Sequence, residues 1–139
     1  MHLIEPLGFS LGDAELTRSS IHFWDEVDLW VHPTWRHFRE AVAAERCYYF
    51  SAKGSRSLWD ARVPDGSCLV FGNETDGMPA RILEKHPERV FRIPMTGAVR
   101  SLNLATAAGI ALYDVLKGLG YGGAPDVSPS HRHGAGARP

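Results

Sequence analysis

The chain has 139 residues, of which 44% are hydrophobic and 22% charged, and its formal net charge at pH 7 is -1. This length and composition predict one globular domain and exclude a disordered chain, because enough apolar residues are present to form a core. No apolar run approaches the roughly 18 residues that a membrane-spanning helix requires, so the sequence predicts no membrane partner.

The charges are unevenly distributed along the chain. Residues 1–30 contain six acidic residues and one arginine, whereas residues 31–62 contain six basic residues and three acidic ones. This distribution indicates a local basic face, although an ordinary solvated surface gives the same pattern. The first residues lack the features of a signal peptide, and two cysteines in apolar runs are typical of free buried thiols. We therefore expect a cytoplasmic protein, with an organelle as the alternative.

Predicted strands and helices alternate along the chain. The pattern predicts strands at residues 2–6, 27–33, 46–54, 67–72 and 90–95, a short helix within residues 7–16, and further helices at residues 35–45, 78–87 and 101–120. Thr34 is expected to cap the second of these helices. Such alternation is typical of an α/β fold with a mostly parallel sheet and flanking helices. Residues 123–139 are rich in Gly, Pro and Ala and are predicted to form a disordered tail.

Three loops follow predicted strands at the positions where open parallel sheets bind ligands. The loops are "SAKGS" after Phe50, "GNETDG" after Phe71 and "PMTGAVRSLN" after Ile93. Each loop contains a glycine, which allows the backbone to approach a ligand closely, and at least one polar side chain. Together the three loops predict one composite pocket.

Each loop taken singly also has a purely structural interpretation. Gly72 and Gly77 can satisfy positive φ angles, Glu74 can cap the helix that begins near Pro79, and Ser101 can cap the last helix. The third loop favours a ligand site, because its polar residues stand at a helix entry, where backbone donors attract an anion or a ribose hydroxyl.

Several common ligand motifs are absent from the sequence. There is no P-loop, no dinucleotide-binding glycine fingerprint and no zinc-ligand spacing, and His131 and His133 in the tail have no further ligand nearby. We therefore predict no metal, and the strand-end glycines favour an adenosine-like ligand without a triphosphate.

The segments "HLIEPLGF", "LVFGNETDGMP" and "RIPMTGAVRSLNLATAAGIALYDVL" resemble successive motifs of the SpoU-type branch of the SPOUT superfamily of RNA methyltransferases. The resemblance is closest to the group that 2′-O-methylates the wobble nucleotide, cytidine or uridine, of tRNA. It implies an enzyme that uses S-adenosyl-L-methionine, acts on tRNA and forms a homodimer. It also implies a methyltransferase domain over residues 1–122 with a deep trefoil knot in its C-terminal part.

The same resemblance assigns roles to particular residues. The implied catalytic set is Glu74, Arg100, Ser101 and Asn103, and the implied cofactor-binding set is Phe50, Gly72, Ile93 and Ser101. Arg100 is expected to position phosphate or to stabilise a developing oxyanion, while the other catalytic residues orient reacting groups.

The sequence departs from the family pattern in two places. Ala105 and Thr106 replace a usual Ser-Asn pair, which weakens one expected polar contact. The family also has a strand and a helix before the segment that corresponds to residues 2–6, with an arginine assigned to activating the ribose hydroxyl. We therefore expect an N-terminally incomplete enzyme. The alternatives are a catalytically silent RNA-binding or cofactor-binding remnant and a nucleotide-binding protein unrelated to RNA.

Aromatic residues are a further source of hypotheses. The four tryptophans are most simply core or interface residues. Trp59, however, is close in sequence to Lys53 and Arg56, so it could stack on a nucleobase. Tyr113 on the last predicted helix is either a core aromatic or part of the dimer contact.

Overall fold

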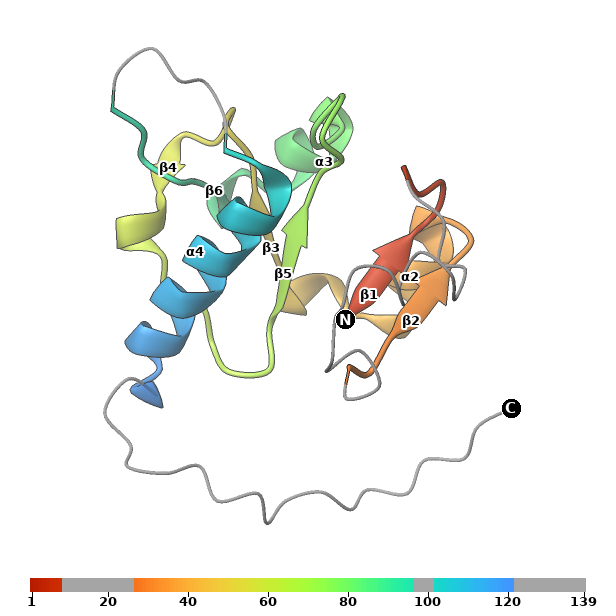
Figure 1. Cartoon of the computed structure of the whole chain (residues 1–139), viewed down its shortest axis with the longest axis horizontal. Coiled ribbons are helices and arrows are strands. Elements are labelled where there is room, and N and C mark those ends of the chain that lie inside the picture. The colour runs from red at the N-terminus through yellow and green to blue at the C-terminus, as the bar shows by residue number, and fades with distance from the viewer. Residues whose placement is uncertain (9–26, 97–101, 122–139) are drawn as a thin grey trace, which may run out of the picture. The chain divides into compact units, whose positions relative to one another are not determined.

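The computed structural model describes residues 1–8, 27–96 and 102–121 (Figure 1). The chain divides into two compact units, residues 1–47 and the residues from Tyr48 onward, and each is described by itself. Most of the short helix predicted within residues 7–16 and the whole predicted tail lie outside the described residues. Among the helices that are described, none is both long and apolar enough to cross a membrane.

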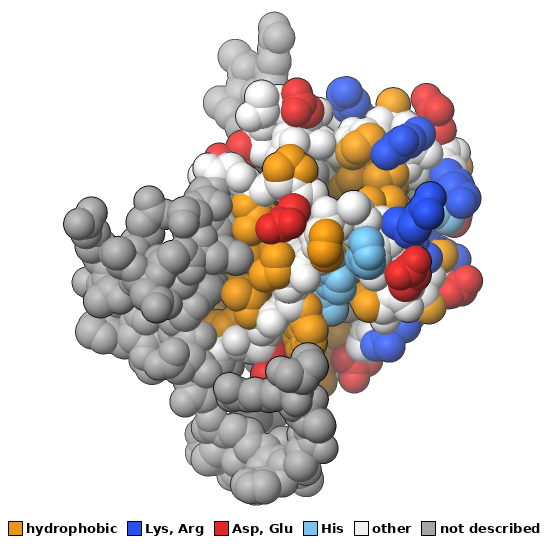
Figure 2. All heavy atoms as spheres, turned by 90° about the vertical axis from the view of Figure 1, so that its right-hand side faces the viewer, with side chains coloured by type: hydrophobic (Ala, Val, Ile, Leu, Met, Phe, Trp, Pro, Cys, Tyr) orange, Lys and Arg blue, Asp and Glu red, His pale blue; other side chains and the backbone are white. Residues whose placement is uncertain are grey.

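The first unit contains a small parallel sheet. β1 (His2–Ile4) pairs with β2 (Trp30–His32), and His2 lies opposite Trp30. The rings of these two residues stack with their centroids 4.9 Å apart. His2 Nδ1 also forms a hydrogen bond of 2.9 Å with His32 Nε2. Figure 2 shows that histidine side chains are present on the face of the molecule that it draws. Both strands of this sheet were predicted from the sequence.

The helix of the first unit begins where the sequence predicts. The side chain of Thr34 accepts a hydrogen bond from the backbone N–H of His37, so Thr34 is the N-cap of α2 (Trp35–Ala41). Phe38 on this helix is 1% exposed and anchors it. The helix is shorter than predicted, because the chain turns at its end into the 3₁₀ helix η2 (Ala44–Arg46).

The second unit is built on a four-stranded sheet. Its strand order is β4 (Arg56–Ser57), β6 (Val90–Arg92), β3 (Cys47–Phe50) and β5 (Cys68–Phe71). β6 pairs in parallel with both β3 and β4, so that Phe91 lies opposite Phe50 on one side and Arg56 on the other. This confirms the prediction of an α/β fold with parallel strands.

Helices and 3₁₀ turns connect these strands. They are η3 (Leu58–Asp60), α3 (Ala80–Lys85) and η4 (Pro87–Arg89), and the long final helix α4 (Leu104–Gly118) follows the last strand. α4 begins three residues later than predicted, and Gly120, with a φ of 87°, follows its end. A residue with positive φ at this point is typical of a helix C-terminus.

The core of the second unit joins the sheet to α4. Phe50, Leu58, Phe91 and Ala111 form one buried cluster that draws on β3, η3, β6 and α4. Ala111 has no exposed surface, so a small side chain lets the helix pack closely on the sheet (Figure 1). This packing sets the position of α4 relative to the strands, and therefore of the residues at its start.

Candidate active site

A cavity of about 500 Å³ lies at the carboxyl ends of β3, β5 and β6 in the second unit. The lining residues come from all three predicted loops and from the start of α4. They are residues 50–53 from the first loop, residues 71–78 from the second, Ile93 and Met95 from the third, and Leu102, Asn103, Leu104 and Ala107. The volume is within the range of about 300 to 1,000 Å³ that is usual for small-molecule sites. The three loops therefore form one pocket, as the sequence predicts.

The second loop is closed by the side chain of Asn73. Asn73 Oδ1 accepts hydrogen bonds from the backbone N–H groups of Asp76, at 2.6 Å, and Gly77, at 3.2 Å. Its amide nitrogen is 3.4 Å from the carboxylate of Asp76, and its backbone carbonyl accepts a bond of 3.1 Å from the N–H of Gly77. These contacts hold the turn in one conformation, and Glu74 lies within that turn. Asp76 is part of this closure through its backbone N–H and its carboxylate.

The two glycines of the loop are required for different reasons. Gly77 has a φ of 70°, a conformation that side-chain-bearing residues rarely adopt. Gly72 is not in that region, but a Cβ atom placed on it would lie 2.1 Å from the backbone carbonyl carbon of Gly77. The positive-φ interpretation is therefore right for Gly77 and wrong for Gly72, where close approach of two backbone segments excludes a side chain.

Glu74 and Asn103 are brought together across 29 residues of sequence. Asn103 donates a hydrogen bond of 3.2 Å from Nδ2 to Glu74 Oε1. Its Oδ1 accepts bonds from the backbone N–H groups of Ala105, at 3.0 Å, and Thr106, at 3.2 Å. Because the amide oxygen is used by the first turn of α4, the amide nitrogen is directed to the carboxylate.

Two structural interpretations of the loops are corrected by this arrangement. Asn103 is the N-cap of α4, so Ser101 does not cap this helix. Pro79 precedes α3, which has no side-chain cap, so Glu74 does not cap that helix either. The carboxylate of Glu74 is instead engaged with Asn103 at the cavity.

The predicted site residues fall into two groups. Five of them line the cavity: Phe50, Gly72, Glu74, Ile93 and Asn103. Arg100 and Ser101 lie outside the described residues. Lys53 also lines the cavity, although it was not among the predicted site residues. The signal that could have identified it is the Lys-Gly pair in the loop after the buried strand β3.

The side chains and backbone groups that line the cavity suit a ligand with one flat apolar part and several hydroxyl or amino groups. Phe50 and Phe71 stack with ring centroids 5.1 Å apart, and Ile93 extends this apolar wall. Polar atoms come from loop backbones, Glu74 and Asn103. Within the described ranges, no cluster of three or more His, Cys, Asp or Glu side chains could hold a metal ion. The arrangement is compatible with an adenosine-containing ligand.

Fold and site together define an α/β protein with a small-molecule cavity at the carboxyl ends of its strands, and comparison with known proteins gives the particular family. Residues 1–113 match the SpoU rRNA Methylase family. The chain is 39% identical over 124 residues to a tRNA (cytidine(34)-2'-O)-methyltransferase of Saccharophagus degradans, which covers 88% of this chain and 80% of that relative. An Escherichia coli K12 protein of the same name is 37% identical over 125 residues, covering 89% of this chain and 80% of that protein.

Comparison with solved structures agrees with the sequence matches. A structure concerned with the 2-OH methylation of C/U34 on tRNA is 42% identical, with a TM-score of 0.77, covering 86% of this chain and 78% of that one. The chain therefore belongs to the SpoU methylase family. The resemblance inferred from the sequence motifs is confirmed.

Proposed function

We propose that the chain transfers a methyl group from S-adenosyl-L-methionine to the ribose 2′-hydroxyl of the wobble nucleotide of a tRNA. Two of its relatives are named for 2′-O-methylation of cytidine 34 in tRNA. The observation that carries the proposal is the cavity at the strand ends, with Glu74 held by Asn103 among its lining residues.

The cavity supplies suitable groups for the cofactor. S-adenosyl-L-methionine supplies a methyl group activated on a sulfonium sulfur. The aromatic ring of Phe50 and the side chain of Ile93 would contact the adenosine part. The backbone at Gly72 and Ile93 would provide hydrogen-bonding groups, and Ser101 completes the proposed cofactor-binding set.

Glu74, Arg100, Ser101 and Asn103 form the proposed catalytic set. A ribose hydroxyl is poorly acidic. The reaction is therefore accelerated by groups that orient the hydroxyl oxygen and accept a hydrogen bond from the hydroxyl. Asn103 occupies Oε1 of Glu74, and Oε2 has no hydrogen-bond partner among the described residues. We assign this second oxygen to the substrate hydroxyl. Arg100 would bind phosphate or stabilise the developing oxyanion.

Two experiments test the proposal. Calorimetric titration with S-adenosylhomocysteine should show binding, and a flat titration with folded protein would contradict the cofactor assignment. Labelled S-adenosyl-L-methionine should then transfer its methyl group to an unmodified tRNA transcript, and Arg100→Ala should abolish the transfer. Cofactor binding without transfer to any tRNA would support the silent remnant instead.

We further propose that the active form is a homodimer to which α4 contributes. Ile110, Leu112 and Tyr113 on this helix are 37%, 46% and 75% exposed, respectively. Apolar side chains that remain exposed on one long helix are suited to contact with a second subunit. Sedimentation of the purified chain should give twice the monomer mass, and Tyr113→Glu should favour the monomer.

Two further features are part of this proposal. We infer that residues 1–122 form one SPOUT domain whose C-terminal part is a deep trefoil knot. The segment between β6 and α4 includes residues 97–101, which the structure does not describe, so a crystal structure traced through this segment is the test. A tRNA substrate is compatible with a cytoplasmic protein, with an organelle as the alternative.

A further inference from the structure

We propose that an exposed tryptophan and the cations around it form an RNA-binding surface beside the cavity, with the indole ring stacked on a nucleobase. The surface, called the Trp59 surface below, consists of Lys53, Arg56, Trp59, Arg62 and Arg92. The inference rests on the proposed function, because it identifies where the RNA substrate contacts the protein.

Trp59 is displayed from a firmly anchored turn. Its side chain is 61% exposed, whereas the adjacent Leu58 has no exposed surface and packs in the core cluster. The N–H of Trp59 donates to Ser57 Oγ at 3.2 Å, and the N–H of Ala61 donates to the carbonyl of Leu58 at 2.9 Å. The turn is therefore closed and the ring is held outward. An exposed ring on a fixed backbone can stack on a base without first being ordered.

The residues that flank Trp59 in the sequence, together with Arg92 on β6, carry the charge that RNA requires. Lys53, Arg56, Arg62 and Arg92 are all exposed, and Asp60 is the only acidic residue between Lys53 and Arg62. The guanidinium of Arg56 lies 4.9 Å from the ring centroid of Phe91 and also donates to the backbone carbonyl of Glu88. Its position is therefore fixed while its charge remains. Cations placed around an aromatic ring are suited to phosphates on either side of a stacked base.

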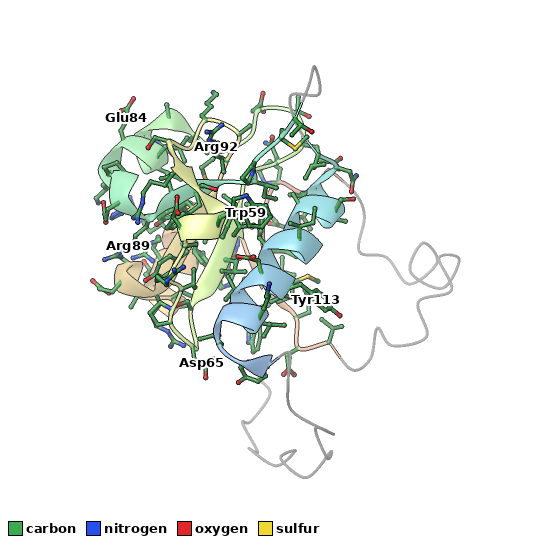
Figure 3. All side chains as sticks on the ribbon, turned by 90° about the vertical axis from the view of Figure 1, so that its left-hand side faces the viewer. Trp59, Asp65, Glu84, Arg89, Arg92 and Tyr113 are labelled. Atoms are coloured by element: carbon green, nitrogen blue, oxygen red, sulfur yellow. The ribbon has the colours of Figure 1, made fainter. Side chains whose placement is uncertain are left out.

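Two residues of the Trp59 surface, Lys53 and Arg92, lie at or next to the cavity lining. Lys53 lines the cavity and also belongs to this surface. Arg92 lies opposite Ser57 in the pairing of β4 with β6, and it directly precedes Ile93, which lines the cavity. Figure 3 shows Trp59 and Arg92 on the same side of the second unit. An RNA that places one ribose at the cavity would therefore bring neighbouring nucleotides to this surface.

A second copy of the chain fits this surface less well than RNA does. In Figure 3, Trp59 and Tyr113 lie on opposite sides of α4, and Tyr113 belongs to the helix face that we propose for the dimer. The exposed arginines would also repel the same arginines of a symmetry-related copy. Charge complementarity therefore favours a polyanion.

The test uses the full chain and an unmodified tRNA transcript with cytidine at the wobble position. Trp59→Ala should weaken binding of the transcript by about 5-fold to 100-fold, the range expected for loss of one base stack. Trp59→Phe keeps a ring and should lose much less. Titration with the transcript should quench tryptophan fluorescence in the wild type, and Trp59→Phe should remove most of the quenching.

Charge variants test the other half of the surface. Arg92→Gln should weaken binding and reduce the dependence of log K on log salt concentration by about 1. Lys85→Gln removes the same charge from an exposed position on α3, outside the Trp59 surface, and should change neither quantity. S-adenosylhomocysteine affinity should be the same in all variants.

The outcomes separate this inference from the proposed function. Suppose that the wild type methylates the transcript and that both Trp59→Ala and Trp59→Phe bind the transcript as tightly as the wild type does. The surface assignment is then wrong and the proposed function stands. If Trp59→Ala instead dissociates a dimer, the surface belongs to a second copy. A wild type that binds neither the transcript nor S-adenosylhomocysteine overturns both proposals.

Discussion

At the scale of single residues, Asn103 connects the helix to the loop that carries Glu74. One side-chain amide caps α4 through its oxygen and holds a carboxylate through its nitrogen. Both residues could be identified from the sequence, because each stands in a polar loop after a predicted strand. Their contact could not, because it depends on how a helix start and a distant turn meet in the folded chain.

Substitution of Asn103 should separate these two roles. Asn103→Ser keeps a capping oxygen but is too short to reach Glu74, whereas Asn103→Ala removes both interactions. We expect Asn103→Ala to lower the free energy of unfolding by about 1 kcal/mol and Asn103→Ser to lower it by much less. Both should strongly reduce methyl transfer. Urea unfolding and a transfer assay measure the two effects, and full activity of Asn103→Ser would show that the bond to Glu74 is not needed.

The glycines provide a second prediction with an internal control. Gly72→Ala places a methyl group against the backbone of Gly77, so the loop must move, and we expect a loss of about 1 to 3 kcal/mol in stability. Gly109→Ala in α4 meets no atom within 4 Å and should instead stabilise the protein by about 0.5 to 1 kcal/mol. Thermal unfolding of both variants measures these changes. Equal stability of Gly72→Ala and Gly109→Ala would contradict the close approach at Gly72.

At the scale of elements, the prediction was best where a strong local signal was present. Thr34 identified the start of α2, and apolar runs identified β3 and β5. β4 was missed because a strand of two residues has no periodicity, and it exists only through pairing with β6. The start of α4 was misplaced because Ser101 and Asn103 are both residue types that cap helices, and the cap is Asn103, which also contacts Glu74.

The pairing of β1 with β2 should make the first unit sensitive to pH. The pKa of His2 is lowered from its ordinary value of 6.5, first by burial and then by the nearby charges of His32 and the N-terminal amine. The folded state therefore binds this proton less readily than the unfolded state. Stability should be full above pH 6.5 and should fall as the pH drops from 6.5 through the lowered pKa of the folded state.

Unfolding by urea between pH 7.5 and pH 5 measures this effect. His2→Gln removes the titrating group, so its unfolding midpoint should depend less on pH over this interval. An identical pH dependence in wild type and variant would show that His2 does not contribute.

At the scale of the whole molecule, the position of the site could be predicted from the sequence, whereas the contacts that shape it could not. The rule that parallel sheets bind ligands at the carboxyl ends of their strands brought three separate loops to one cavity. The closure of the second loop by Asn73 and the exposure of Trp59 were not predictable, because both depend on packing around single side chains. Family membership then supports a specific chemistry for the cavity.

The central claim is tested most directly by locating the transferred methyl group. Labelled S-adenosyl-L-methionine is incubated with the full chain and an unmodified tRNA transcript, and the digested product is analysed nucleotide by nucleotide. We expect the label on the 2′-oxygen of the wobble nucleotide, and a rate at least about 100-fold lower for Glu74→Gln, comparable to losing a group that acts on the reacting proton. A chain that binds S-adenosylhomocysteine yet labels no nucleotide, or labels a different one, would contradict the account.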